Sequence, residues 1–176
     1  MKIKILIHHT GFFSNDTARN LEQWIRNSFN WDFPYNILIS KDWEYIEPNP
    51  RGSRAWSTMN ERINKNSIAV SLVWNFEEEE PTEEQIKTLK QLISEIKQEY
   101  KIDGIIGHKD VWNTVCPWKN LYRIIPDLNV NNKNMEERIA KSIVTLLWIL
   151  WDMTDDEKLR WILSNTADKI REKYDI

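Results

Sequence analysis

The chain has 176 residues, with 41% apolar and 29% charged side chains and a net charge of -3, which describes an ordinary globular protein long enough to bury a core. It has no block of Lys and Arg interleaved with aromatic residues, so it lacks the concentrated positive charge that nucleic-acid binding requires. Its single cysteine, Cys116, excludes an internal disulfide.

The first third of the chain alternates between strand and helix patterns. Residues 2–7 alternate and then become apolar, which predicts a strand entering a core. A helix is expected over residues 17–29, with possible N-caps at Ser14, Asn15 and Asp16 and an apolar face of Leu21, Trp24, Ile25 and Phe29. Two short strands are expected at 35–40 and 44–47, and a long polar loop at 48–66.

The middle of the chain carries the clearest signals. Residues 67–74 form an apolar run typical of a central strand. Thr82 and Gln85 have the spacing of a capping box, and a helix with the apolar face Ile86, Leu89, Ile93, Ile96 and Tyr100 follows them. A short strand at 104–107 then leads to His108. Strands alternating with helices predict an α/β domain.

After about residue 134 the pattern changes to two helices, at 135–151 and 155–174, the second opened by a box formed by Thr154 and Glu157. We therefore expect a domain at 1–131 and a helical hairpin at 132–176 that serves in targeting or oligomerisation, or simply belongs to the core. The apolar run at 143–151 is too short to span a bilayer. The expected buried stripe is Ile139, Ile143, Leu147, Leu159, Ile162 and Ile170.

The three histidines, His8, His9 and His108, all lie at the ends of predicted strands, and Cys116 follows His108 by eight residues. Two imidazoles and one thiolate can bind Zn²⁺ tetrahedrally and leave a fourth position for water. On chemistry alone, either His8 or His9 fits, but strand alternation points them to opposite faces, so only one can face the site. The alternative is that these are unrelated core or surface residues.

Four segments, at residues 7–10, 33–36, 66–70 and 107–117, occur in an order that resembles the type 2 N-acetylmuramoyl-L-alanine amidase family. That family includes phage lysozyme-type amidases and animal peptidoglycan recognition proteins. The resemblance covers roughly residues 2–128. It implies a central mixed β-sheet flanked by helices, with a zinc cleft at the strand ends.

The resemblance also implies roles for individual residues. The metal ligands correspond to His8, His108 and Cys116, with the ligand at the first of the two adjacent histidines. Tyr35 corresponds to a tyrosine that donates a hydrogen bond to the developing oxyanion, although a strand aromatic in the core is the alternative. Thr114 corresponds to a position that orients water or substrate; a turn-capping threonine is the alternative.

The implied activity is zinc-dependent hydrolysis of the amide between N-acetylmuramic acid and L-alanine in peptidoglycan. The alternative is a non-catalytic peptidoglycan-binding module of the same fold. A structural zinc domain fits less well, because structural sites usually close with four protein ligands. The N-terminus has no signal-peptide pattern, so we expect synthesis in the cytoplasm. The enzyme would then act on muropeptides there or, as a phage endolysin does, on the cell wall after release.

One compositional feature is unusual. The chain has 4 Gly and 10 Trp, whereas average usage predicts about 12 Gly in this length. Trp43, Trp56, Trp74 and Trp118 stand where the family normally has glycine. We hypothesise that the gene uses UGA for glycine and was translated with UGA as tryptophan, which predicts glycine-like backbone geometry at Trp43, Trp74 and Trp118. The alternative is genuine tryptophan that packs against sugar rings.

Overall fold

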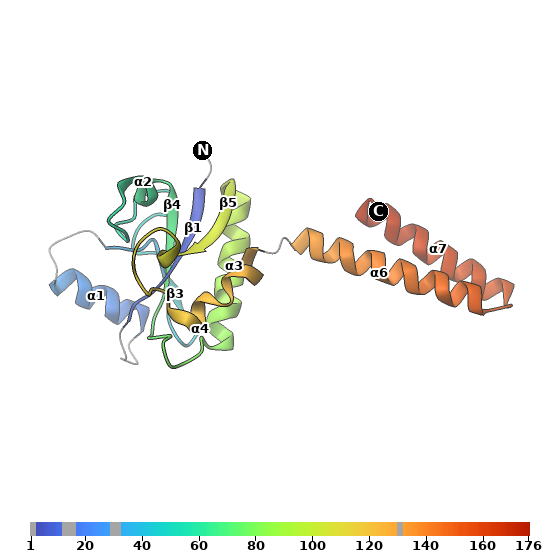
Figure 1. Ribbon diagram of the computed structural model, residues 1–176, viewed down its shortest axis with the longest axis horizontal. Helices are drawn as coiled ribbons and strands as arrows, with labels where there is room; N and C mark the ends of the chain where they lie inside the picture. Colours follow the sequence, from blue (N-terminus) through green and yellow to red (C-terminus); the bar gives the residue numbers. More distant parts are fainter. Residues whose placement is uncertain (1–2, 12–16, 29–32, 130–131) are drawn as a thin grey trace. The chain divides into compact units, whose positions relative to one another are not determined.

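The computed structural model describes residues 3–11, 17–28, 33–129 and 132–176 (Figure 1). Its internal contacts divide the chain into two compact units, Met1–Asn129 and Val130–Ile176. The expected N-caps Ser14, Asn15 and Asp16 and the expected core residue Phe29 lie outside the described residues.

The first unit is built on a five-stranded sheet with the strand order β3-β2-β4-β1-β5. The strands are β1 (Ile3–His9), β2 (Ile37–Ile39), β3 (Tyr45–Ile46), β4 (Ser67–Leu72) and β5 (Ile102–Gly107). The pairs β1–β4, β1–β5 and β2–β4 are parallel, and β3 is antiparallel to β2. This confirms the mixed sheet predicted from the sequence, and it places the carboxyl ends of β1, β2, β4 and β5 along one edge.

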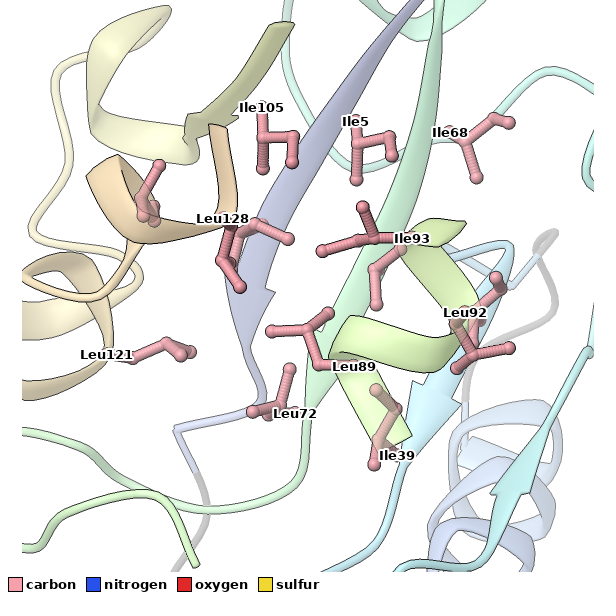
Figure 2. Packing of buried hydrophobic residues seen from close by; sticks show 14 of the residues in the cluster. Ile5, Ile39, Ile68, Leu72, Leu89, Leu92, Ile93, Ile105, Leu121 and Leu128 are labelled. Carbon is pink, nitrogen blue, oxygen red and sulfur yellow. The ribbon is translucent and has the colours of Figure 1, made fainter. Parts of the chain in front are cut away.

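Helices cover both faces of the sheet. α3 (Glu83–Glu99) begins at the capping box of Thr82 and Gln85, as predicted. It packs its buried side chains against one face (Figure 2), and these are Leu89, Leu92, Ile93 and Ile96. α1 (Ala18–Ser28) contributes to a second cluster with Leu38 of β2, whose neighbours Ile37 and Ile39 belong to the first cluster. Successive side chains of β2 therefore point to opposite faces of the sheet and pack into the two clusters in turn.

Some local predictions were wrong. Trp24, expected in the apolar face of α1, is 46% exposed. The expected loop at 48–66 contains a short helix, α2 (Glu61–Lys65), which the Asn60 side chain caps by accepting hydrogen bonds from two backbone N–H groups. After β5, the short helical segments η1 (His108–Asp110), α4 (Trp118–Tyr122) and α5 (Ile125–Asn129) also lack a clear signal in the sequence, because none is long enough to show helical periodicity.

The second unit consists of α6 (Asn132–Met153) packed against α7 (Glu157–Tyr174). Asp156 caps α7, rather than the predicted Thr154, by accepting from the backbone N–H groups of Lys158 and Leu159. No helix in the described part of the chain is long and apolar enough to cross a membrane.

The buried stripe of the hairpin differs from the predicted one. The described residues buried between the two helices are Ala140, Val144, Leu163 and Ala167. Four residues expected inside are 41–54% exposed, and these are Ile139, Ile143, Leu159 and Ile162. Small side chains let two helix axes approach closely, so the contact line runs through the alanines rather than through the larger residues beside them.

This arrangement can be tested by changing each stripe separately. Ala140→Leu should destabilise the protein by about 1–3 kcal/mol, because extra methylenes overpack a close helix contact. Ile139→Ala should change the stability by less than about 0.5 kcal/mol, because this side chain is exposed and alanine favours helix. Urea unfolding followed by circular dichroism measures both. If Ile139→Ala cost more than Ala140→Leu, the assignment of the buried face would be wrong.

Candidate metal centre

His8 and His108 meet because two parallel strands end side by side. In the β1–β5 pair, Ile7 lies opposite Gly107. His8 and His108 are the next residues after this pair, one after each partner. The two imidazole ring centroids are 4.5 Å apart. His8 is almost fully buried, and His108 is half-buried. Two residues separated by one hundred positions in the sequence therefore lie side by side at the end of the sheet.

Cys116 reaches the same place from the loop after η1. The backbone N–H of Lys109 donates to the carbonyl oxygen of Cys116 at 2.8 Å, which ties the loop back onto η1. The Cys116 Sγ lies 3.7 Å from Nδ1 of His8. The candidate ligand atoms of His8, His108 and Cys116 all lie within 4.8 Å of one another. The structure thus brings together the three residues that the sequence suggested as ligands.

Burial sets the protonation of this cluster. It lowers the pKa of His8 well below its usual value, and the neighbouring His108 and His9 lower it further. Burial also lowers the pKa of His108. It raises the pKa of the Cys116 thiol to about 12, partly opposed by a hydrogen bond from the His9 backbone. At neutral pH the imidazoles are therefore uncharged, with a lone pair on each ring, and a thiolate here needs a cation beside it.

These residues fit a bound Zn²⁺. The Nε2 atoms of His8 and His108 are buried, and neither has a hydrogen-bond partner among the described residues. Buried polar atoms without partners are costly, so such atoms call for a ligand. Two imidazole nitrogens and one sulfur are donors that zinc favours, and three protein ligands leave one position open.

Tyr35 lies against this cluster. Its ring centroid is 5.2 Å from that of His8, in a tilted arrangement. Burial raises the pKa of the Tyr35 hydroxyl above its usual value, and the nearby Cys116 raises it further. The hydroxyl therefore keeps its proton at neutral pH and can donate a hydrogen bond.

Two asparagines hold the segment that carries Tyr35. The Asn49 side-chain amide donates to the carbonyl oxygens of Phe33 and Tyr35, at 2.7 and 2.9 Å. The Asn36 side-chain oxygen accepts from the backbone N–H of Ala69 in β4 at 2.9 Å. Sequence reasoning missed Asn49; the only signal for it is its place between two prolines in a polar loop.

The remaining candidates lie around the cluster. Thr114 is half-buried, and its hydroxyl accepts from the backbone N–H of Cys116 at 3.2 Å, so it shapes the loop that carries the sulfur. His9 is outside the three-residue cluster; its ring lies edge-on to Trp118, with 6.5 Å between the centroids. Burial, followed by His108, lowers the pKa of His9 to about 4. Ser71 is buried opposite His8 in the β1–β4 register.

A mixed sheet with two histidines and a cysteine gathered at its carboxyl edge defines an α/β domain with a candidate metal centre. The chain belongs to the N-acetylmuramoyl-L-alanine amidase family, whose profile matches residues 3–119.

The proteins similar to this chain include both peptidoglycan recognition proteins and an amidase. The chain is 30% identical to peptidoglycan-recognition protein SC2 of Drosophila simulans over 134 residues, covering 68% of this chain and 70% of that protein. It is 25% identical to mouse peptidoglycan recognition protein 1 over 138 residues, 69% and 71% of the two chains. Among solved structures, the N-acetylmuramoyl-L-alanine amidase LysC of Clostridium intestinale superimposes with a TM-score of 0.62 at 26% identity, covering 74% and 87%. Whether this chain catalyses or only recognises therefore depends on its own site.

The support of Tyr35 can be tested through Asn49. Asn49→Ala leaves the carbonyl oxygens of Phe33 and Tyr35 without their donor and should cost about 2 kcal/mol in the free energy of unfolding. Asn66→Ala is the control, because the Asn66 amide makes one exposed bond, to the carbonyl oxygen of Arg62. Urea titration compares the two. A smaller loss for Asn49→Ala than for Asn66→Ala would show that Asn49 does not hold this segment.

Proposed function

We propose that this protein is a zinc-dependent N-acetylmuramoyl-L-alanine amidase that cuts the amide between the lactyl group of N-acetylmuramic acid and L-alanine in peptidoglycan. The observation that carries the proposal is the convergence of His8, His108 and Cys116 within 4.8 Å, with Tyr35 against His8. Membership of the amidase family supports the substrate class.

Each residue has a defined task in this reaction. His8 and His108 would supply neutral nitrogens, and Cys116 would supply sulfur, to hold the ion. When bound, Zn²⁺ polarises the scissile carbonyl and lowers the pKa of water. Tyr35 keeps its proton and donates a hydrogen bond to the oxygen on which negative charge develops. Thr114 keeps the Cys116 loop in place through its bond to the backbone N–H.

The second candidate is a peptidoglycan-binding module without activity, and the names of several relatives favour it. Recognition alone needs neither a ligand set nor an oxyanion donor. This chain keeps two buried imidazole nitrogens without hydrogen-bond partners in the described residues, beside a buried thiol. That arrangement carries a free-energy cost that a pure binding surface has no reason to bear, which supports the enzyme. Substrates would be muropeptides in the cytoplasm, or the cell wall if the protein is released as an endolysin.

The metal assignment can be tested by comparing adjacent histidines. The wild-type chain should bind one Zn²⁺, and both His8→Ala and Cys116→Ser should lower the zinc content sharply, because a hydroxyl is a poor replacement for a thiolate. His9→Ala should keep its zinc, because His9 lies outside the cluster. Elemental analysis of dialysed protein measures this. Full zinc content in Cys116→Ser would overturn the ligand set, and loss in His9→Ala alone would reassign it.

Catalysis can be separated from binding through Tyr35. Tyr35→Phe should keep the fold and the zinc but lower turnover by about 10²-fold, because only a transition-state donor is removed. Tyr45→Phe, on the exposed side of β3, is the control and should stay within a few-fold of wild type. Release of peptides with N-terminal L-alanine from purified sacculi measures activity. If zinc-loaded wild type released none, the recognition module would be the better description. If Tyr35→Phe kept full activity, Tyr35 would be a packing residue.

A further inference from the structure

Three tryptophans adopt a backbone conformation that suits glycine. In the described part of the chain, the non-glycine residues with positive φ are Trp43 (81°), Trp74 (141°), Trp118 (66°) and Asp175 (54°). Asp175 ends α7 in the left-handed region, which aspartate tolerates. A bulky side chain at positive φ is a true outlier, because its Cβ approaches the neighbouring carbonyl oxygen.

Chance does not account for this set. Only a few per cent of non-glycine residues have positive φ, so the nine tryptophans outside residues 29–32 should contribute well under one case. They contribute three. The same chain has only 4 glycines, about a third of the number expected for its length. The positions that need glycine and the excess of tryptophan therefore coincide.

Each of the three positions is a turn at the carboxyl edge of the sheet or beside Cys116. Trp43 lies in the turn between β2 and β3, closed by a hydrogen bond from the Ser40 N–H to the carbonyl oxygen of Glu44. Trp74 follows β4, and its carbonyl oxygen accepts from the N–H of Gly11 at 3.2 Å.

Trp118 comes two residues after Cys116, and its N–H donates to the carbonyl oxygen of Val115 at 2.7 Å. In all three places the bonds are made by the backbone, which glycine makes equally well.

The indoles at these positions differ in their surroundings, yet all three residues have a positive φ. The Trp43 side chain is 66% exposed, whereas Trp74 is 7% exposed and lies under the amino group of Lys41. Shared packing therefore cannot explain the shared positive φ. Turn geometry is the feature that the three positions have in common.

We infer that the natural protein has glycine at positions 43, 74 and 118, encoded by UGA codons that its own organism reads as glycine. UGA differs by one base both from the glycine codon GGA and from the tryptophan codon UGG. A UGA-decoding glycine tRNA therefore needs only a changed anticodon, and a conceptual translation with UGA as tryptophan yields the sequence printed here.

Trp56 does not belong to this set. Its φ is not positive, and its ring stacks on the Arg54 guanidinium at 3.4 Å, as a genuine tryptophan can. The inference therefore covers three of the four tryptophans that stand at glycine positions of the family. It also changes the description of the candidate metal centre. With glycine at 118, the indole that lies edge-on to His9 is absent, and the second residue after Cys116 has no side chain.

The direct experiment determines the codons of the gene and the amino-acid sequence of the natural protein. We expect UGA at positions 43, 74 and 118 and UGG at 24 and 56, and peptide mass spectrometry of the protein from its own cells should show glycine at the three UGA positions. UGG codons at these three positions would end the inference. UGA codons with tryptophan in the peptides would also end it, because the organism would then read UGA as tryptophan.

A second experiment tests the backbone independently of the gene. Trp43→Gly in the recombinant chain should raise the midpoint of thermal unfolding by about 4 °C, because it relieves the left-handed strain at an exposed turn. Trp43→Ala should raise it less, because alanine keeps the Cβ. Trp161→Gly is the matched control: it is 68% exposed but lies in α7, where glycine lowers the midpoint. Equal midpoints for Trp43→Gly and Trp43→Ala would show that the turn does not require glycine.

The buried position gives the sharpest contrast. If Trp74 were native, Trp74→Gly would leave a cavity in the core and lower the midpoint by about 10 °C. If glycine is native, the variant with glycine at 43, 74 and 118 should be at least as stable as the chain with three tryptophans and should give a higher soluble yield. A large loss of stability in this triple variant would overturn the inference. Neither result depends on zinc or on amidase activity.

Discussion

The register between β1 and β5 is the constraint on which the candidate centre depends. Ile5 lies opposite Ile105 and Ile7 opposite Gly107, so the histidines that follow lie side by side. Both isoleucines of the first pair are buried. A slip of one residue would turn these core side chains toward the other face of the sheet, and it would separate His8 from His108 at the same time. The hydrophobic core therefore fixes the geometry of the polar site.

The third ligand has no such support from the sheet. Cys116 is held by the backbone bond from Lys109 and by the Thr114 hydroxyl, while Asp110 accepts from the Gly107 N–H and from the Tyr122 hydroxyl. These bonds form one short network around η1. Strand pairing thus positions the two imidazoles of the centre. The sulfur is positioned by hydrogen bonds within a loop, for which solvent can compete.

Features with a periodic or local signal could be predicted from the sequence, and others could not. The mixed sheet and the capping box of Thr82 follow from alternation and spacing, and the histidines were found because they end apolar runs. Asn49 could not be found, because a side-chain bond to a distant carbonyl oxygen leaves no pattern. The prediction of the buried stripe of the hairpin was wrong because α6 has apolar side chains on more than one side. Periodicity then does not decide which side is buried, and small residues such as Ala140 do.

The geometry that builds the centre also explains where glycine is needed. Parallel strands that end at one edge must each turn within a few residues if their side chains are to converge there, and the polypeptide makes such turns most cheaply with a residue that accepts positive φ. Trp43 and Trp74 follow β2 and β4 at this edge, and Trp118 follows the ligand loop. The requirement for glycine at these positions and the gathering of His8, His108 and Cys116 are therefore two results of the same sheet topology.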